Sequence, residues 1–169
     1  HTFAQFLKTY EDAREVGFTN VNVDIMSALP GQSVDSFQET LKALMHLNPV
    51  PEHISAYSLI IEEGTPFYTL WEQEKLALPD EDSERQMYDL TEDVLSANGF
   101  HRYEISNYAK AGYECRHNCG YWRRTEYLGL GIGAASLMKE WRFRNGRNLE
   151  AYIRNPLSVR EELQQLSLE

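Results

Sequence analysis

The sequence predicts an α/β fold in which strand and helix units alternate to build a parallel sheet. One observation predicts the fold class, and a second indicates that the chain is only part of that fold. The first 65 residues are expected to run helix, strand, helix and strand, which is the order that βα units give on a parallel sheet. Two parallel strands alone are too few for a stable sheet, so we expect the chain to be a fragment that lacks the preceding strands.

The two helices of this repeat have separate local signals. Residues 2–16 carry apolar side chains at helical intervals, and Thr2 with Gln5 has the spacing of a capping box. Residues 34–47 carry a second apolar stripe with the same period, after a turn that contains proline and glycine. Both segments are therefore expected to pack one face against the sheet.

The two strands differ in pattern. Residues 54–61 are a mostly apolar run of strand length, whereas residues 21–26 alternate in character. One face of the earlier strand carries Val21, Val23 and Ile25, and the other carries Asn22, Asp24 and Met26. We therefore expect one apolar face against helices and one face open to a ligand or to solvent.

The rest of the chain predicts a smaller α+β region. Residues 76–99 indicate a long acidic amphipathic helix, and the aromatic, glycine and basic residues after residue 100 indicate short strands and loops. Residues 149–153 are expected to be helical. Ser158 with Glu161 repeats the capping-box spacing, which predicts a last helix that runs to the end of the chain.

Composition excludes several classes of protein. No apolar run approaches the roughly 20 residues needed to cross a bilayer, and the N-terminus has no basic-then-apolar signal pattern. Only two cysteines occur, which fits a reducing compartment. We therefore predict a cytoplasmic protein without membrane insertion. The net charge of −10 argues against binding to nucleic acid.

The charge is unevenly distributed. Residues 62–93 carry 11 acidic and 2 basic side chains, whereas residues 100–160 carry 5 acidic and 11 basic side chains. Either both stretches are solvated faces, or the basic stretch binds an anionic small ligand. Under the second interpretation, ligand carboxylates would pair with Arg116, Arg123 and Arg124.

Asp24 is the first candidate for a functional residue. If the Val/Ile face of its strand packs on helices, the carboxylate faces the inside of a barrel or the ligand side of a sheet. A carboxylate there needs a partner or a ligand hydroxyl. The alternative is an edge strand on which Asp24 is simply hydrated.

His117 is the second candidate, and it lies between two cysteines. Cys115, His117 and Cys119 supply too few ligands for a zinc site, so we expect no structural metal. A neutral imidazole is a common axial ligand of haem iron, and the aromatic rings of Tyr121 and Trp122 are suited to stacking on a macrocycle. The alternative is an imidazole that is packed or hydrogen-bonded within the protein.

A glycine-rich segment lies at residues 129–133, with the sequence GLGIG. It has neither the spacing of the dinucleotide fingerprint nor the Gly-Lys-Ser/Thr ending of a phosphate loop. Its expected use is a close backbone approach, either between elements or to a flat ligand, because glycine adds no side chain.

Four stretches together resemble a known family. They are residues 23–32 (VDIMSALPGQ), 103–109 (YEISNYA), 114–122 (ECRHNCGYW) and 127–134 (YLGLGIGA). This set is similar to the radical SAM family that contains the HemW haem chaperones and the oxygen-independent coproporphyrinogen III oxidase-like proteins. The aspartate-to-LPGQ stretch occurs in several radical SAM relatives, but the four motifs in this order are specific to the family.

The resemblance implies a fold and a set of cofactors. The fold is a partial (β/α) barrel, with residues 1–99 as later strand–helix units and residues 100–169 as the start of a smaller C-terminal region. Relatives bind a [4Fe-4S] cluster through three cysteines spaced Cys-x3-Cys-x2-Cys, and the cluster binds S-adenosylmethionine. These cysteines are absent here, so the fragment alone is expected to be inactive and to carry no catalytic residue of its own.

The resemblance also assigns residues. Asp24 and Met26 match contacts to the nucleoside of S-adenosylmethionine, and Ile60 matches a third contact after the next strand. His117 matches the proposed haem ligand of the family, with Tyr121 and Trp122 as its neighbours. The sequence departs from the family in two places: Ser27 and Ala28 replace an aromatic residue and a glycine, and Ala135 replaces a histidine.

Three functions follow as hypotheses. The first is a haem chaperone that delivers haem to respiratory proteins. The second is an anaerobic oxidase that decarboxylates coproporphyrinogen III, which shares the barrel, the cluster and a tetrapyrrole ligand. The third is a non-catalytic cytosolic binding module that has inherited the scaffold.

Overall fold

The computed structural model describes residues 2–157 and 160–167. These residues form two compact units, one ending at Glu114 and the other beginning at Cys115. The predicted division between residues 99 and 100 concerns the organisation of the longer protein and stays a prediction, although two strands after residue 100 belong to the first compact unit.

The first unit is built on a four-stranded mixed sheet. Strand β1 (Asn22–Ser27) pairs in parallel with β2 (His53–Ser58), as the alternation of helices and strands predicts. Strand β4 (Asn107–Ala109) pairs antiparallel with the other edge of β2, and β3 (His101–Arg102) pairs with β4. The order β1-β2-β4-β3 therefore leaves β1 at one edge of the sheet.

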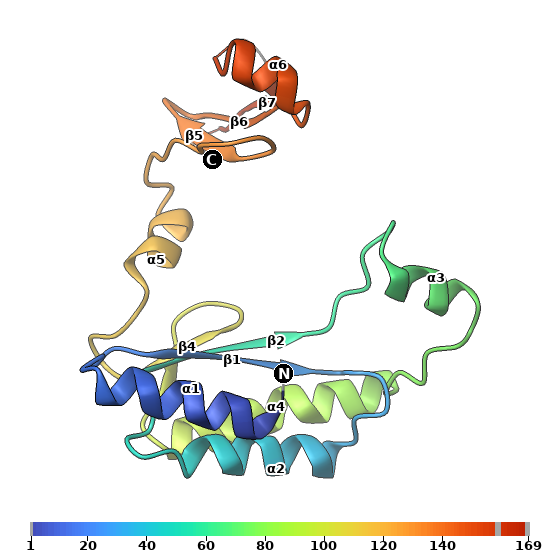
Figure 1. The fold of residues 1–169 in the computed structure, drawn as a ribbon, viewed down its shortest axis with the longest axis vertical. Coiled ribbons are helices and arrows are strands. Elements are labelled where there is room, and N and C mark those ends of the chain that lie inside the picture. The colour runs from blue at the N-terminus through green and yellow to red at the C-terminus, as the bar shows by residue number, and fades with distance from the viewer. Residues whose placement is uncertain (1, 158–159, 168–169) are drawn as a thin grey trace. The chain divides into compact units, whose positions relative to one another are not determined.

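Three helices cover one face of this sheet (Figure 1). They are α1 (Phe3–Glu15), α2 (Val34–Met45) and α4 (Glu81–Ala97). Side-chain oxygens of Thr2, Ser33 and Asp80 accept hydrogen bonds from the first turn of each helix, which satisfies amide groups that have no partner within the helix. The short helix α3 (Pro66–Glu72) was not predicted, although Thr65 caps it and Pro66 occupies its first turn.

The core lies between the sheet and these helices. Val23, Ile54 and Tyr108 are consecutive in register across β1, β2 and β4, and all three are buried. They pack with Leu44 of α2 and Leu95 of α4. Because side chains alternate along a strand, burying this face turns every other residue of β1 and β2 to the opposite face.

A buried ion pair fixes the end of α1 to the beginning of β2. The guanidinium of Arg14 donates to Glu52 Oε2 at 2.8 Å, and the two side chains are only 10% and 12% exposed. The same oxygen accepts from the backbone amide of Val21, and Arg14 also donates to the hydroxyl of Tyr10. The pair therefore holds α1 against the first residues of both parallel strands.

The second unit contains a three-stranded antiparallel sheet and two short helices. Strands β5 (Ala135–Met138), β6 (Trp141–Asn145) and β7 (Arg160–Gln165) lie in sequence order. Helix α5 (Arg116–Trp122) precedes them, and α6 (Leu149–Arg154) agrees with the helix predicted at residues 149–153.

The predicted last helix is wrong where the structure describes it. Ser158, the proposed cap, lies outside the described residues, but Arg160–Gln165 forms strand β7. These residues pair with β6, with Trp141 opposite Gln165 and Asn145 opposite Arg160. Pairing with a neighbouring strand outweighs the weak local preference of charged and amide residues for a helix.

Breaking the Arg14–Glu52 pair tests how α1 is held. We expect Arg14→Met to lower the free energy of unfolding by about 3 kcal/mol, because it leaves the Glu52 carboxylate buried without its counter-charge. The double variant Arg14→Met/Glu52→Gln should recover much of that loss. Urea denaturation of the four proteins in the cycle measures the effect, and equal losses in the single and double variants would contradict this account.

Candidate functional site

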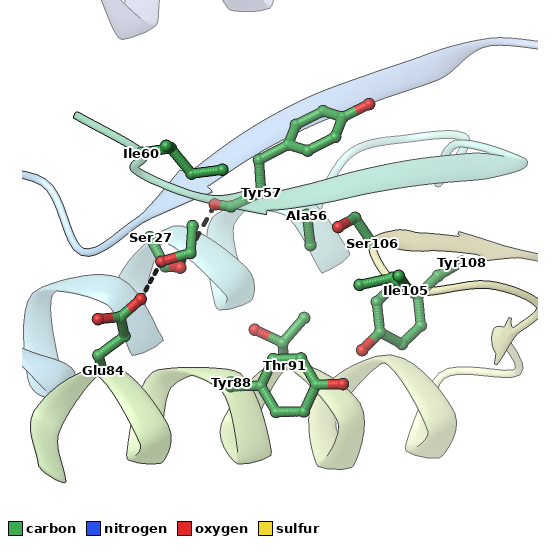
Figure 2. Close-up of a pocket in the computed structure, with 11 residues that line it drawn as sticks. Ser27, Ala56, Tyr57, Ile60, Glu84, Tyr88, Thr91, Ile105, Ser106 and Tyr108 are labelled. Atoms are coloured by element: carbon green, nitrogen blue, oxygen red, sulfur yellow. Dashed lines mark hydrogen bonds between the residues drawn. The ribbon is translucent and has the colours of Figure 1, made fainter. Parts of the chain in front are cut away.

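The face of the sheet away from the helices carries the polar residues of β1 and β2. Val23 is 6% exposed, whereas its neighbour Asp24 is exposed and Met26 is 43% exposed. The predicted alternation along this strand is therefore confirmed. Tyr57, which pairs in register with Met26, also projects from the side of β2 away from α4 (Figure 2).

Asp24 and Met26 line a hollow of about 600 Å³ beside strand β1. Phe3 and Phe6 of α1 contribute aromatic rings to it, and Gln32 contributes an amide. Gln32 donates to the carbonyl of Met26 and accepts from the amide of Leu29, so it ties the turn after β1 back to the end of the strand. The hollow combines a carboxylate with apolar and aromatic walls, which is a common composition for a small-molecule site.

Ile60 lies in a different cavity, of about 260 Å³, between α4 and the sheet (Figure 2). It is two residues beyond the end of β2 and 74% exposed. The same cavity is lined by Ser27, Tyr57 and Glu84, and the hydroxyl of Ser58 donates to the Glu84 carboxylate. The structure thus brings Asp24 and Met26 to one hollow and puts Ile60 on another, and the assignment of all three as nucleotide contacts stays a prediction.

The face of the sheet away from the helices, here called the open face, carries a polar cluster that was not predicted from the sequence. His53 lies opposite Asn22 in register, is only 5% exposed, and hydrogen-bonds to Asn22 Oδ1 at 2.6 Å. Its other ring nitrogen lies 2.7 Å from the hydroxyl of Tyr103. A histidine at the first position of an apolar strand is the one local signal for this cluster, and the partners come from distant parts of the chain.

Asn107 extends the same polar face on β4. Its amide nitrogen donates to Glu104 Oε1 at 2.5 Å, while its side-chain oxygen is buried and has no hydrogen-bond partner among the described residues. Hydrogen bonds from Asn107 and from the backbone of Ser106 lower the pKa of Glu104 despite the opposing effect of its burial. Buried polar atoms usually have partners, so Asn107 Oδ1 is suited to accept a hydrogen bond from a ligand.

The predicted haem residues lie together on helix α5 of the second unit. The rings of His117 and Tyr121 meet edge to face, with centroids 4.6 Å apart, because residues four apart share one face of a helix. Tyr121 in turn meets Tyr127 edge to face at 4.8 Å. Trp122 is 58% exposed. His117 and Tyr121 therefore begin a row of three aromatic rings.

This aromatic row borders a basic slot of about 440 Å³. The slot is lined by Tyr121, Tyr127, Arg124 and Arg142, with apolar residues of the sheet between them. Arg124 already donates to Glu140 at 2.5 Å and to the carbonyl of Ser167. Arg142 forms no ion pair among the described residues, so it is the arginine in the slot that is available to an anionic ligand.

Sequence reasoning selected Arg116, Arg123 and Arg124 and missed Arg142. Arg142 lies on β6 opposite Leu137, about twenty positions after the aromatic motif. Only the pairing of β5 with β6 brings it to the same slot as Tyr121. The uneven charge of the chain did indicate a basic region here, but not which arginine would be unpaired.

The glycine-rich segment makes the predicted close approach between elements. A Cβ at Gly129 would lie 2.2 Å from the carbonyl oxygen of Ala135, closer than any side chain allows. The segment is then fixed by Asn145, which donates to the carbonyls of Gly129 and Gly131. Its function in the described structure is to let the bridge between Tyr127 and Leu137 form.

Two residues that depart from the family pattern, Ala28 and Ala135, have identifiable surroundings in the structure. Ala28 has a φ of 58°, in the left-handed region that favours glycine, and it is buried. Ala135 lies on β5 and lines the basic slot. A histidine at that position would stand at the wall of the slot, so the alanine removes an imidazole from it.

Two further observations concern the thiols and the helices of the described residues. Cys115 and Cys119 form no disulfide in the described structure, and no group of three or more His, Cys, Asp or Glu side chains in the described ranges is arranged to hold a metal ion. Among the same residues, no helix is both long and apolar enough to cross a membrane.

Comparison with solved structures defines the class of fold. The chain superposes on the coproporphyrinogen III oxidase HemN of Escherichia coli, a radical SAM enzyme, with a TM-score of 0.74 at 21% sequence identity. The match covers 99% of this chain and 41% of that structure. The fold is therefore that of part of a radical SAM protein, as the sequence predicts. No protein-family model matches the chain.

Sequence comparison places the chain more narrowly. It is 39% identical over 153 residues to the haem chaperone HemW of Bacillus subtilis and 34% identical over 154 residues to that of Lactococcus lactis. These matches cover 90% and 91% of the chain, but the chain spans only about 40% of the length of each relative. A mitochondrial radical S-adenosyl methionine domain-containing protein of Danio rerio is 41% identical over 134 residues. The chain belongs to the HemW/HemN-like family of radical SAM proteins.

The burial of His53 predicts a dependence of stability on pH. Desolvation lowers the pKa of His53 below its ordinary value of 6.5, although the negative charges of Asp24 and Glu104 oppose the shift. The unfolded chain then binds a proton at a higher pH than the native chain. This contribution to stability is present above pH 6.5 and is lost as the pH falls from there to the native pKa.

Two measurements check this expectation. An NMR titration should give His53 a midpoint below 6.5, and the loss of unfolding free energy between pH 7.5 and pH 5.5 should be smaller in His53→Asn than in the native chain. The exposed His46 supplies the control variant His46→Asn. A midpoint at or above 6.5 would show that burial does not dominate at this site.

The close approach at Gly129 predicts a site-specific sensitivity to a single methyl group. We expect Gly129→Ala to destabilise the second unit by about 1–3 kcal/mol, because the new Cβ must displace the backbone at Ala135. Gly120→Ala is the matched control, since a Cβ there meets only Thr125 at 3.7 Å. Thermal unfolding followed by NMR of the second unit distinguishes the two, and equal stability of both variants would refute the close approach.

Proposed function

We propose that this chain is part of a cytoplasmic haem-binding radical SAM protein that captures haem and delivers it to respiratory proteins. Haem is the cargo in this proposal, and His117 supplies the axial ligand to its iron. The observation that carries the proposal is the row of His117, Tyr121 and Tyr127 beside a basic slot. The similarity to haem chaperones gives the ligand its identity.

The residues around His117 suit each part of a haem. The imidazole supplies a nitrogen ligand, and exposed faces of Tyr121 and Trp122 suit the macrocycle. The propionates are carboxylates, for which the guanidinium of Arg142 is the available partner in the slot. We therefore assign iron binding to His117 and propionate binding to Arg142, with Arg124 held in place by Glu140.

The first unit is proposed to bind S-adenosylmethionine in the longer protein. The carboxylate of Asp24 is suited to accept hydrogen bonds from ribose hydroxyls, and Met26 to contact the nucleoside from the same hollow. Ile60 lines a separate cavity beyond the end of β2, so its contact with the same ligand requires a ligand that extends past the hollow that Asp24 and Met26 line. When bound, a cluster and S-adenosylmethionine supply radical chemistry, and the residues described here bind and orient the nucleoside.

Cys115 and Cys119 do not fit a [4Fe-4S] cluster. Clusters of this kind need more thiolates than the two in this chain, and the family resemblance implies three at a different spacing. We propose that the cluster ligands belong to the part of the relatives' length that this chain does not span.

Oxidation of coproporphyrinogen III is the alternative function. The structural similarity to HemN is at 21% identity and concerns the fold alone. An oxidase would form protoporphyrinogen from coproporphyrinogen under anaerobic, reducing conditions, whereas a chaperone would retain haem without converting a porphyrinogen. Product analysis of the full-length protein therefore distinguishes the two.

Haem titration of the 169-residue chain tests the assignment of His117. We expect His117→Ala to weaken haem binding at least about tenfold and to move the Soret band, because an imidazole ligand is lost from the iron. The control is His101→Ala, which removes another partly exposed imidazole, in the first unit. An unchanged Soret position and stoichiometry in His117→Ala would exclude this residue as the ligand.

A further inference from the structure

A chain of side-chain hydrogen bonds runs across the open face of the sheet and ends on Asp24. The hydroxyl of Tyr103 lies 2.7 Å from His53 Nε2, and His53 Nδ1 lies 2.6 Å from Asn22 Oδ1. Asn22 Nδ2 then donates to Asp24 Oδ1 at 2.7 Å. Ser55 adds a weaker hydrogen bond to Asn22 Oδ1 at 3.3 Å. Five residues from three parts of the sequence are thereby connected.

The direction of each hydrogen bond follows from the Asp24 carboxylate, at which the series of hydrogen bonds ends. A carboxylate only accepts, so the Asn22 amide must turn its nitrogen to Asp24 and its oxygen to His53. That oxygen also only accepts, so the proton of His53 lies on Nδ1. In neutral His53, Nε2 is then an acceptor, and the Tyr103 hydroxyl donates to it. One tautomer of His53 therefore satisfies every contact.

The surroundings favour this neutral tautomer. His53 is 5% exposed, and its desolvation lowers the pKa of the imidazole, while the charges of Asp24 and Glu104 act in the opposite direction. Tyr103 meets the ring of His53 edge to face, with centroids 5.6 Å apart. The imidazole is thus held by its two hydrogen bonds and by packing, which leaves it little freedom to rotate.

Asp24 depends on this chain for its orientation. Its carboxylate is on an exposed part of β1, and Asn22 is the one side chain in the described ranges that donates a hydrogen bond to it. An exposed carboxylate without such a contact samples several rotamers. Because Asn22 is itself exposed, the buried His53 is the rigid group through which the two side chains are ordered.

We propose that His53, as the Nδ1–H tautomer, is a positioning residue that orients Asp24 through Asn22 to bind the hydroxyl groups of a nucleoside. This inference rests on the proposed binding of S-adenosylmethionine by Asp24. His53 touches neither the nucleoside nor any reacting atom. It holds the Asp24 carboxylate in the orientation that binds two adjacent hydroxyls before the ligand arrives. The entropic cost of ordering the Asp24 side chain on binding is therefore smaller.

The tautomer is tested first on the 169-residue chain. Long-range ¹⁵N–¹H NMR spectra at pH 7.5 distinguish a protonated Nδ1 from a protonated Nε2, and we expect Nδ1–H for His53. In Tyr103→Phe, which removes the donor to Nε2 and keeps the ring, we expect the Nδ1–H tautomer to persist, because Asn22 Oδ1 still accepts from Nδ1. A predominant Nε2–H tautomer in the native chain would overturn the inference.

The effect on binding is tested in the full-length protein with its cluster reconstituted anaerobically. Calorimetric titration with S-adenosylmethionine compares two variants, of which leucine is close to histidine in volume and asparagine is smaller. His53→Leu removes the donor, and we expect affinity to fall about tenfold. His53→Asn puts an amide nitrogen near the position of Nδ1, and we expect affinity within about threefold of the native protein. If His53 acted only by packing, the larger leucine would preserve the affinity for S-adenosylmethionine better than asparagine, which is the opposite order.

Asp24→Asn distinguishes failure of this inference from failure of the proposed function. If Asp24→Asn leaves the affinity for S-adenosylmethionine unchanged, the carboxylate is not a nucleoside contact and both proposals fail. If Asp24→Asn weakens binding while His53→Leu does not, the nucleoside contact stands and the positioning role of His53 is wrong. If His53→Leu does not fold, Tyr103→Phe decides the question, with an expected loss in affinity of about threefold and an unchanged affinity as the contrary result.

Discussion

The parallel register of β1 with β2 is the constraint on which the first unit depends. Val23 lies beside Ile54 and both are buried under the helices, so Asp24 and Ser55 must face the other way. A shift of one residue in β1 would bury the Asp24 carboxylate against apolar helices, at a cost of several kcal/mol. The hydrophobic core therefore determines which residues reach the face of the sheet away from the helices.

The same register assembles the polar cluster. Asn22 and His53 are paired across the two strands, and β4 adds Asn107 opposite Ser55. The polar face is satisfied mostly from within, through hydrogen bonds between side chains, and one buried oxygen of Asn107 is left over. Satisfied polar networks hold their members in one arrangement, as the proposed binding of a nucleoside by Asp24 requires.

The second unit arranges aromatic and basic groups by a different means. Helical spacing alone brings His117 and Tyr121 into contact, but the slot beside them needs strand pairing and the close approach at Gly129. Arg124 is paired with Glu140, so its charge is already neutralised within the protein. Arg142 reaches the slot from β6, where it lies opposite Leu137. Nearby sequence motifs and distant residues therefore contribute equally to this surface.

The sequence by itself determined the alternating helices and strands of the first unit, the faces of β1, and the family, because periodicity and motifs are local properties. It also singled out Asp24 and His117, whose chemical types are unusual for their surroundings. Only the tertiary structure decided that Arg160–Gln165 is a strand and that Ile60 lies apart from Asp24. It also decided that His53 belongs to the polar cluster with Asn22, and that Arg142 belongs to the basic slot with Tyr121. These outcomes depend on pairing between residues far apart in the chain, and no local pattern encodes such pairing.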